Sequence, residues 1–218
     1  MGLMRITVLV SGRGSNLGAL ISASRAPAFK GAVTHVISNK ASAGALSIAE
    51  DHAIATSLVD SKAFADRSAF DGALSTAVHA SEPDLIVLAG FMRVLPADFV
   101  ERHAGRLINI HPSLLPLYPG LSTHRRALAD GVRIHGCTVH FVTADVDTGP
   151  IIAQAAVPVR RDDDEASLSA RVLAEEHRLL PAVVRWFCAG QLALVDGRVR
   201  LEVEETRGAL CVPSPAAT

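Results

Sequence analysis

Short apolar runs alternate with longer amphipathic stretches along the first half of the chain. Runs rich in Val, Ile and Leu predict strands at residues 5–10, 32–38, 56–59, 84–89 and 107–110. The stretches between them predict helices at 16–23, 42–52, 67–80 and 97–103. In the third of these, Phe70, Leu74 and Val78 recur every four residues, which is helical spacing. Apolar strands separated by helices are typical of a parallel sheet that is buried on both faces.

The pattern changes after Gly120. The segments IHGCTVHFVT and PIIAQAAVPV predict two longer strands joined by a turn-rich connection, so we expect an antiparallel extension of the sheet. Residues 160–190 are amphipathic with acidic residues at their start, and they predict one long helix. After it, LALVDGRVRLE predicts a small hairpin that turns at Asp196-Gly197.

These elements predict a single domain over residues 1–205 and a loose tail over 206–218. No internal repeat, low-complexity tract or interdomain linker interrupts the sequence. The expected fold class is α/β: a doubly wound, mostly parallel sheet with an antiparallel C-terminal extension and a long C-terminal helix.

Composition narrows the class of partner. The 21 Lys+Arg balance 22 Asp+Glu and form no basic block, so nucleic acid is not the expected partner. Cys137, Cys188 and Cys211 lie far apart, which suggests neither a disulfide framework nor a zinc site. No run approaches the roughly 20 apolar residues of a membrane span, and the N-terminus lacks a signal-peptide pattern. We expect a cytoplasmic protein that binds small molecules.

The glycine-rich segment SGRGSNL directly follows the first predicted strand, where open α/β sheets bind ligands. Gly12 and Gly14 let backbone N–H groups approach an anion, and Ser15 and Asn16 add donors at a helix start. The segment lacks the G-K-[ST] of a Walker loop and the third glycine of G-x-G-x-x-G. It predicts a phosphate site rather than a dinucleotide site; a simple tight turn with a capping serine is the alternative.

The segment LAGFMRVLP follows the fourth predicted strand. It places Arg93 among Met92, Val94 and Leu95, and a cation among apolar side chains suits a flat, partly anionic ligand. Taken alone, this segment is more typical of core packing than of a pocket.

Asn109 and His111 stand two residues apart at the end of the fifth predicted strand, followed by Pro112. An amide and a protonated imidazole are donors that stabilise an oxyanion. A carboxylate would favour the protonated imidazole, and Asp147 is the candidate, although a turn-forming Asp explains that residue equally well. We interpret seven other histidines as hydrogen-bonded structural residues: His35, His52, His79, His103, His124, His135 and His140.

Five segments, in this order and spacing, resemble the glycinamide ribonucleotide formyltransferases: SGRGSNL, LAGFMRVL, NIHPSLLPLYPG, DTGPII and EEH. The likeness covers nearly the whole chain. Folate-dependent formyl transferases in general share the third segment and the downstream Asp. The segment SGRGSNL, called the phosphate segment below, narrows the choice among these enzymes. The resemblance implies a Rossmann-like formyltransferase fold. It also implies an enzyme of purine biosynthesis that formylates 5'-phosphoribosylglycinamide, with 10-formyltetrahydrofolate as co-substrate and no metal.

The resemblance also implies residue roles. The catalytic trio would be Asn109, His111 and Asp147, with Asn109 and a protonated His111 stabilising the oxyanion and Asp147 assisting. Contacts to the substrate phosphate would come from Gly14, Ser15 and Asn16, and Glu176 would hold the glycinamide part. Folate would contact Arg67, Met92, Arg93, Val94, Leu95, Asn109, Thr143, Ala144, Asp145, Val146 and Asp147. Residues 1–105 would form the phosphate-binding half and residues 106–205 the catalytic and folate-binding half, in a monomer or homodimer.

Two positions depart from the family pattern. Leu173 stands where some members have a polar residue near the phosphate, and Arg13 lies between the two glycines. Both bear on phosphate affinity more than on the chemistry.

Three other functions are compatible with part of this sequence. Methionyl-tRNA formyltransferase shares the trio, but it would require an RNA-binding barrel and a basic surface. Formyltetrahydrofolate hydrolase resembles the same core and usually carries an N-terminal regulatory domain. A non-catalytic nucleotide-binding module is the third, and it would have no need of Asn109, His111 and Asp147 together.

Overall fold

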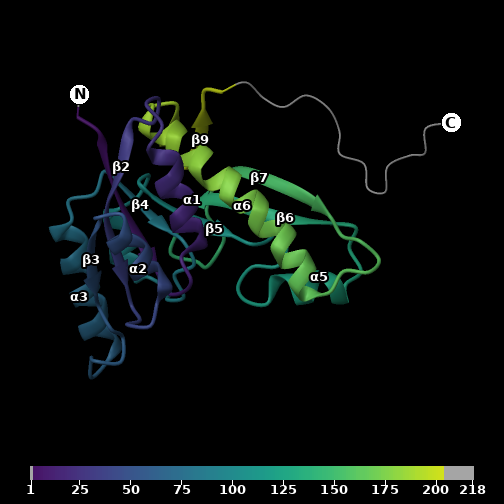
Figure 1. Ribbon diagram of the computed structural model, residues 1–218, viewed down its shortest axis with the longest axis horizontal. Coiled ribbons are helices and arrows are strands. Elements are labelled where there is room, and N and C mark those ends of the chain that lie inside the picture. The colour runs from purple at the N-terminus through teal and green to yellow at the C-terminus, as the bar shows by residue number, and fades with distance from the viewer. Residues whose placement is uncertain (1, 204–218) are drawn as a thin grey trace.

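The computed structural model describes residues 2–203, which form a seven-stranded sheet with helices on both faces (Figure 1). The strand order is β3-β2-β1-β4-β5-β6-β7. The strands are β1 (Met4–Val10), β2 (Gly31–Ser38), β3 (Ala55–Leu58), β4 (Leu85–Leu88), β5 (Leu107–His111), β6 (Ile134–Phe141) and β7 (Ile151–Pro158). The first five are parallel, and β6 and β7 add in antiparallel pairing. The predicted fold class is confirmed.

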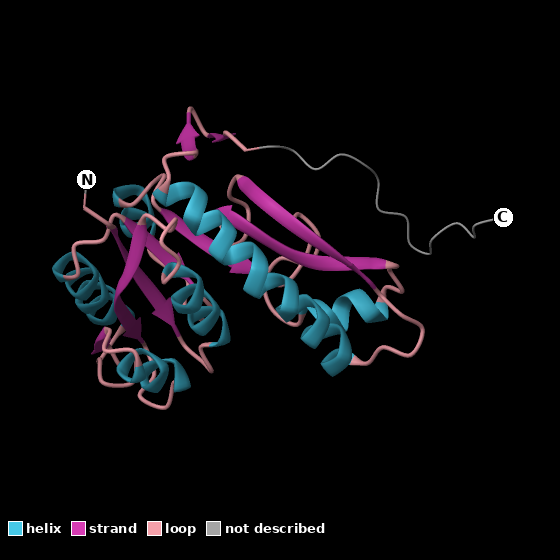
Figure 2. Cartoon of the chain, turned by 45° about the horizontal axis from the view of Figure 1, so that its top comes forward, coloured by secondary structure: helices cyan, strands magenta, loops and turns pink. Residues whose placement is uncertain are grey.

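Helices bury both faces of this sheet (Figure 2). One face carries α1 (Ser15–Ser24), α2 (Gly44–Asp51) and α6 (Glu165–Cys188), and the other carries α3 (Arg67–Ala80) and α4 (Ala97–Arg102). Along β1, Val8 and Val10 lie in the first hydrophobic cluster, whereas Leu9 lies in the second. Alternate side chains of a strand point to opposite faces, so a strand covered on both sides is apolar at most positions.

Capping residues set the starts of the two longest helices. The Asp66 carboxylate accepts a hydrogen bond from the Ala69 amide at 2.8 Å, and α3 spans the predicted range. At the start of α6, Asp164 and Ser167 cap each other reciprocally. Such capping satisfies backbone N–H groups that have no partner within the helix.

Two local predictions were incomplete. Helix α5 (Thr123–Ala129) was not predicted, because only two of its seven residues are buried and so short a segment shows no clear period. Strand β5 extends one residue further than predicted, so His111 belongs to the strand and pairs with Thr138.

The C-terminal hairpin is confirmed as β8 (Leu192–Val195) and β9 (Arg198–Leu201). Both turn residues, Asp196 and Gly197, have positive φ, as a two-residue hairpin turn of this type requires. The predicted tail, residues 206–218, lies outside the described residues. Within residues 2–203, no helix is both long and apolar enough to cross a membrane.

Candidate active site

Two of the predicted loops are joined by hydrogen bonds at the carboxyl edge of the sheet. Ser11, which follows β1, donates its hydroxyl to Asn39 Oδ1 at 2.5 Å and accepts from the Met92 amide at 2.8 Å. The Ser11 amide donates to the Gly90 carbonyl at 3.2 Å. Sequence reasoning missed Ser11, because a buried serine after a strand carries no distinctive signal. These bonds join the phosphate segment and the segment after β4 into one rim.

The structure brings the predicted trio together. Asn109 and His111 point from the same side of β5, and Asp147 approaches them from the loop after β6. His111 Nδ1 lies 3.3 Å from Asp147 Oδ2, and Asn109 Nδ2 lies 3.5 Å from Asp147 Oδ1. An amide, an imidazole and a carboxylate therefore share one small space, although 38 residues separate the first from the last.

A hydrogen bond to its side chain and a tightly packed backbone at Gly149 fix the position of Asp147. Its Oδ2 accepts a hydrogen bond from the Gly120 amide at 2.8 Å, and its own φ is 56°. Two residues later, a Cβ on Gly149 would overlap the Phe141 carbonyl oxygen, so only glycine fits there. Burial by itself would raise the pKa of Asp147, but the nearby His140 imidazole, the hydrogen bond from the Gly120 amide and the His111 imidazole lower it below its usual value.

His111 is buried, with 7% of its side chain exposed, and both ring nitrogens face acceptors. Nε2 lies 2.9 Å from the Tyr118 carbonyl oxygen, which can only accept, so Nε2 carries a proton. Burial lowers the pKa of His111 below its usual value, and the Tyr118 carbonyl and Asp147 offset this only in part. Burial thus opposes the protonated ring, whereas the acceptors at both nitrogens favour it, and the role of Asp147 in keeping His111 protonated stays a prediction.

His140, interpreted from the sequence as a hydrogen-bonded structural residue, is buried and hydrogen-bonded, and it also lies beside Asn109 and Asp147. The antiparallel pairing of β5 with β6 places it directly opposite Asn109. Its Nδ1 donates to the Phe141 carbonyl at 2.9 Å, and its Nε2 lies 3.2 Å from Asn109 Nδ2 and 3.7 Å from Asp147 Oδ1. Only the strand register reveals this placement, since His140 has no motif of its own.

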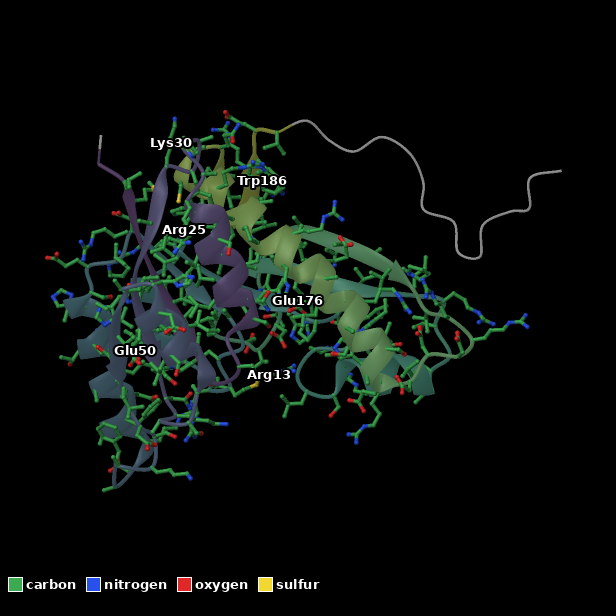
Figure 3. The ribbon with its side chains drawn as sticks, viewed as in Figure 1. Arg13, Arg25, Lys30, Glu50, Glu176 and Trp186 are labelled. Atoms are coloured by element: carbon green, nitrogen blue, oxygen red, sulfur yellow. The ribbon has the colours of Figure 1, made fainter. Side chains whose placement is uncertain are left out.

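The phosphate segment closes tightly onto α2 and α6. Gly14 has a φ of 84°, and a Cβ there would lie 2.6 Å from the Ala45 Cα. Asn16 Nδ2 donates to Glu176 Oε2 at 2.7 Å, and Figure 3 labels Glu176 on α6 and Arg13 in the loop before α1. Burial raises the pKa of Glu176, and the bond from Asn16 offsets this in part. The arrangement joins backbone donors and a buried carboxylate, which together suit a phosphorylated ligand carrying N–H or O–H groups.

The predicted folate residues form a partly apolar rim. Met92 is 61% exposed and Val94 49% exposed, whereas Leu95 is buried in the core. The Arg67 guanidinium donates to the Val94 carbonyl at 2.6 Å, and the Arg93 guanidinium lies 5.5 Å from the centroid of a phenylalanine ring. A small cavity of about 130 Å³ lies beside both arginines. Exposed apolar side chains next to two cations fit a flat ligand with an anionic end.

The loop over residues 143–147 ends at Asp147, the third member of the trio. Val146 is 50% exposed. The hydroxyls of Thr143 and Thr148 lie 3.1 Å from each other and 3.3 and 3.1 Å from the Asp145 carbonyl oxygen, and together these contacts connect the two ends of the loop. Across residues 2–203, no three His, Cys, Asp or Glu side chains are grouped so that they could hold a metal ion.

A family model, a similar sequence and a similar crystal structure all relate this chain to formyl transferases. Residues 4–184 match the family model described as formyl transferase. A protein of Escherichia coli (strain K12) named phosphoribosylglycinamide formyltransferase is 49% identical over 199 residues, which covers 91% of this chain and 94% of that one. The crystal structure of glycinamide ribonucleotide transformylase 1 from Symbiobacterium toebii is similar with a TM-score of 0.87 and 46% identity, covering 91% and 94%.

A formyltetrahydrofolate deformylase from Pseudomonas syringae pv. tomato also has a similar structure. Its TM-score is 0.84 at 27% identity, and the match covers 91% of this chain and 66% of the deformylase. Transfer and hydrolysis of a formyl group therefore occur on the same scaffold, and the fold alone does not distinguish them.

Proposed function

The chain belongs to the formyl transferase family, and on that premise we propose that it transfers the formyl group of 10-formyltetrahydrofolate to the amine of 5'-phosphoribosylglycinamide. The observation that carries the proposal is the meeting of two sites at one edge of the sheet. Asn109, His111 and Asp147 form a cluster that could stabilise an oxyanion. In the second site, Asn16 of the phosphate segment pairs with Glu176. A hydrolase acting on the folate alone would have no use for the second site.

The proposed reaction forms one bond and breaks another. The substrate amine attacks the formyl carbon, and the carbonyl oxygen takes up negative charge. The tetrahedral intermediate then collapses with cleavage of the bond to folate N10. The amine nitrogen loses a proton and N10 gains one, so the step needs no oxidant or reductant.

The trio would act on the charge that develops in this reaction. Asn109 Nδ2 lies 3.2 Å from His140 and 3.5 Å from Asp147, distances long enough that the amide can exchange these partners for the oxyanion. His111 would supply the second donor, since an adjacent oxyanion favours the protonated ring and opposes the effect of burial. Asp147 would then accept or relay the proton that leaves the amine.

The two substrates would approach from opposite sides of the trio. We assign the phosphate to the backbone donors of Gly14 and Ser15 with the Asn16 side chain, and the glycinamide N–H groups to Glu176. The pterin would contact the loop over 143–147 and the segment over 92–95. The glutamate carboxylates of the folate would pair with Arg67 and Arg93, which flank the small cavity.

A formyl-transfer assay tests the proposal. Purified protein is mixed with 10-formyltetrahydrofolate and glycinamide ribonucleotide, the folate product is followed by absorbance, and free glycinamide replaces the ribonucleotide in the control. We expect turnover that requires the phosphorylated amine. Folate turnover without any amine would instead identify a hydrolase, and folate binding without turnover would identify a binding module.

A further inference from the structure

The Ser113 hydroxyl and the His111 ring both contact the backbone of Leu117 and Tyr118. His111 Nε2 donates to the Tyr118 carbonyl at 2.9 Å. The single hydroxyl hydrogen of Ser113 makes its short bond to the Leu117 carbonyl at 2.6 Å, and the same hydroxyl makes a longer contact of 3.2 Å with the Tyr118 carbonyl. Ser113 therefore holds the two peptide units that carry the acceptor of His111.

Ser113 is itself anchored to the sheet. Its side chain is fully buried, and its amide donates to the His111 carbonyl at 2.9 Å. Its carbonyl accepts from Thr138 Oγ1 at 2.7 Å, and that hydroxyl also receives the Leu115 amide at 3.0 Å and Gln154 Nε2 at 2.9 Å. Ser113 therefore has a position defined by β6 and β7 rather than by the exposed loop that follows it.

Tyr118 needs such an anchor because its backbone is in an unfavourable conformation. Its φ is 56°, a left-handed value that L residues other than glycine adopt only at a cost. Its ring packs edge-on against His135 with centroids 5.9 Å apart, and the Arg126 guanidinium lies 5.3 Å from the ring centroid. His135 and Arg126 thus hold the Tyr118 ring, while the Ser113 hydroxyl holds the backbone at Leu117 and Tyr118.

We propose that Ser113 is a positioning residue for formyl transfer: it holds the Tyr118 carbonyl against His111 Nε2 and so turns Nδ1 toward Asp147 and the reacting atoms. The inference rests on the function proposed above. A hydrogen bond at one imidazole nitrogen fixes which tautomer forms and how the ring is oriented, and the other nitrogen is then the one available for chemistry. Here the available nitrogen is Nδ1, 3.3 Å from Asp147.

The same contact affects the charge of the ring. Donation to the Tyr118 carbonyl raises the pKa of His111, so loss of the anchor should lower that pKa. The other charged or titratable groups near the ring are Asp147, His140, Arg126, His124 and His135. Since none of them is changed by substituting Ser113, a shift in the pKa of His111 would report the carbonyl contact.

The test compares Ser113→Ala with Ser81→Ala in the full chain. Ser81 is a matched control because it is also buried and hydrogen-bonded. Its hydroxyl contacts the Val78 carbonyl and the Thr7 hydroxyl, and neither residue contacts the trio. In Ser113→Ala we expect kcat to fall about tenfold or more, because a catalytic group displaced by about 1 Å can cost that much or more. The KM of each substrate should stay within about twofold, since the Ser113 side chain is fully buried and not accessible to a substrate.

The pKa of His111 is measured in parallel by NMR titration of its ring. It should fall in Ser113→Ala and stay unchanged in Ser81→Ala, although both variants lose a buried hydrogen bond. Ser113→Cys keeps the volume with a weaker donor, so it should fall between wild type and Ser113→Ala, and it replaces Ser113→Ala if that variant does not fold.

Two results would overturn the inference. One is a folded Ser113 variant with wild-type kcat and wild-type titration of His111. The other is an equal shift in Ser81→Ala, which would make the effect a general loss of stability. The titration needs no substrate, so it remains informative if the wild-type protein fails to transfer a formyl group and the proposed function is wrong.

Discussion

Replacing Asp147 by Asn removes one charge from the site and little else. The side chain keeps its size, and its remaining oxygen can still accept the Gly120 amide, which lies 2.8 Å from Oδ2 in the wild-type protein. The substitution removes the carboxylate 3.3 Å from His111 Nδ1, which is also the proposed acceptor of the amine proton. We therefore expect kcat to fall on both counts, and the pH dependence isolates the part that comes from the protonation of His111.

The size of the effect follows from this distance. Two unit charges 3.3 Å apart attract by about 1 kcal/mol in water and about 5 kcal/mol at an effective dielectric constant of about 20. Losing about 1.4 kcal/mol of this attraction would reduce the protonated fraction at neutral pH, and with it kcat, by about tenfold. This loss adds to the effect of burial, which already lowers the pKa of His111.

The assay is kcat as a function of pH, with NMR titration of His111 beside it. If the protonated ring is required, kcat falls as the pH rises through its pKa, so Asp147→Asn should move this fall to lower pH. Asp98→Asn is the control, because Asp98 forms an exposed ion pair with Arg102 at 2.7 Å and should leave the profile unchanged. A folded Asp147→Asn variant with an unshifted profile would refute the electrostatic role of this carboxylate.

Three further predictions concern the surroundings of the site. Gly149→Ala should cost about 1–3 kcal/mol in the free energy of unfolding, measured with urea, because its Cβ would overlap the Phe141 carbonyl; an unchanged urea midpoint would contradict this. The pKa of His135 is lowered to about 4 by burial in the folded protein. The unfolded protein therefore binds a proton at His135 more readily than the folded protein does. Stability should then fall as the pH drops from about 6.5 toward about 4, by on the order of 3 kcal/mol, and His135→Gln should flatten this part of the curve if the reasoning holds. Asn16→Ala should leave Glu176 without its hydrogen bond and raise the KM of the phosphorylated amine about tenfold, with the KM of the folate as the unchanged reference.

Much of the architecture is decided by local sequence. The strands of the parallel sheet were predictable because a strand covered on both faces is apolar at most positions, and α3 was predictable from the spacing of Phe70, Leu74 and Val78. The hairpin turn at Asp196-Gly197 follows from the positive φ that both positions require. Asn109 and His111 could be singled out because residues at the carboxyl end of a parallel strand face the ligand edge.

Other features were decided only by the tertiary structure. His140 joins the site because antiparallel register places it opposite Asn109, and Ser11 joins because its hydroxyl meets the loop after β4. The Ser113 hydroxyl meets His111 only through a carbonyl in a left-handed turn. Burial lowers the pKa of His111, and Asp147 raises it. Periodicity and turn chemistry act over a few residues, whereas register, burial and desolvation arise when segments tens of residues apart pack together, so no local pattern carries them.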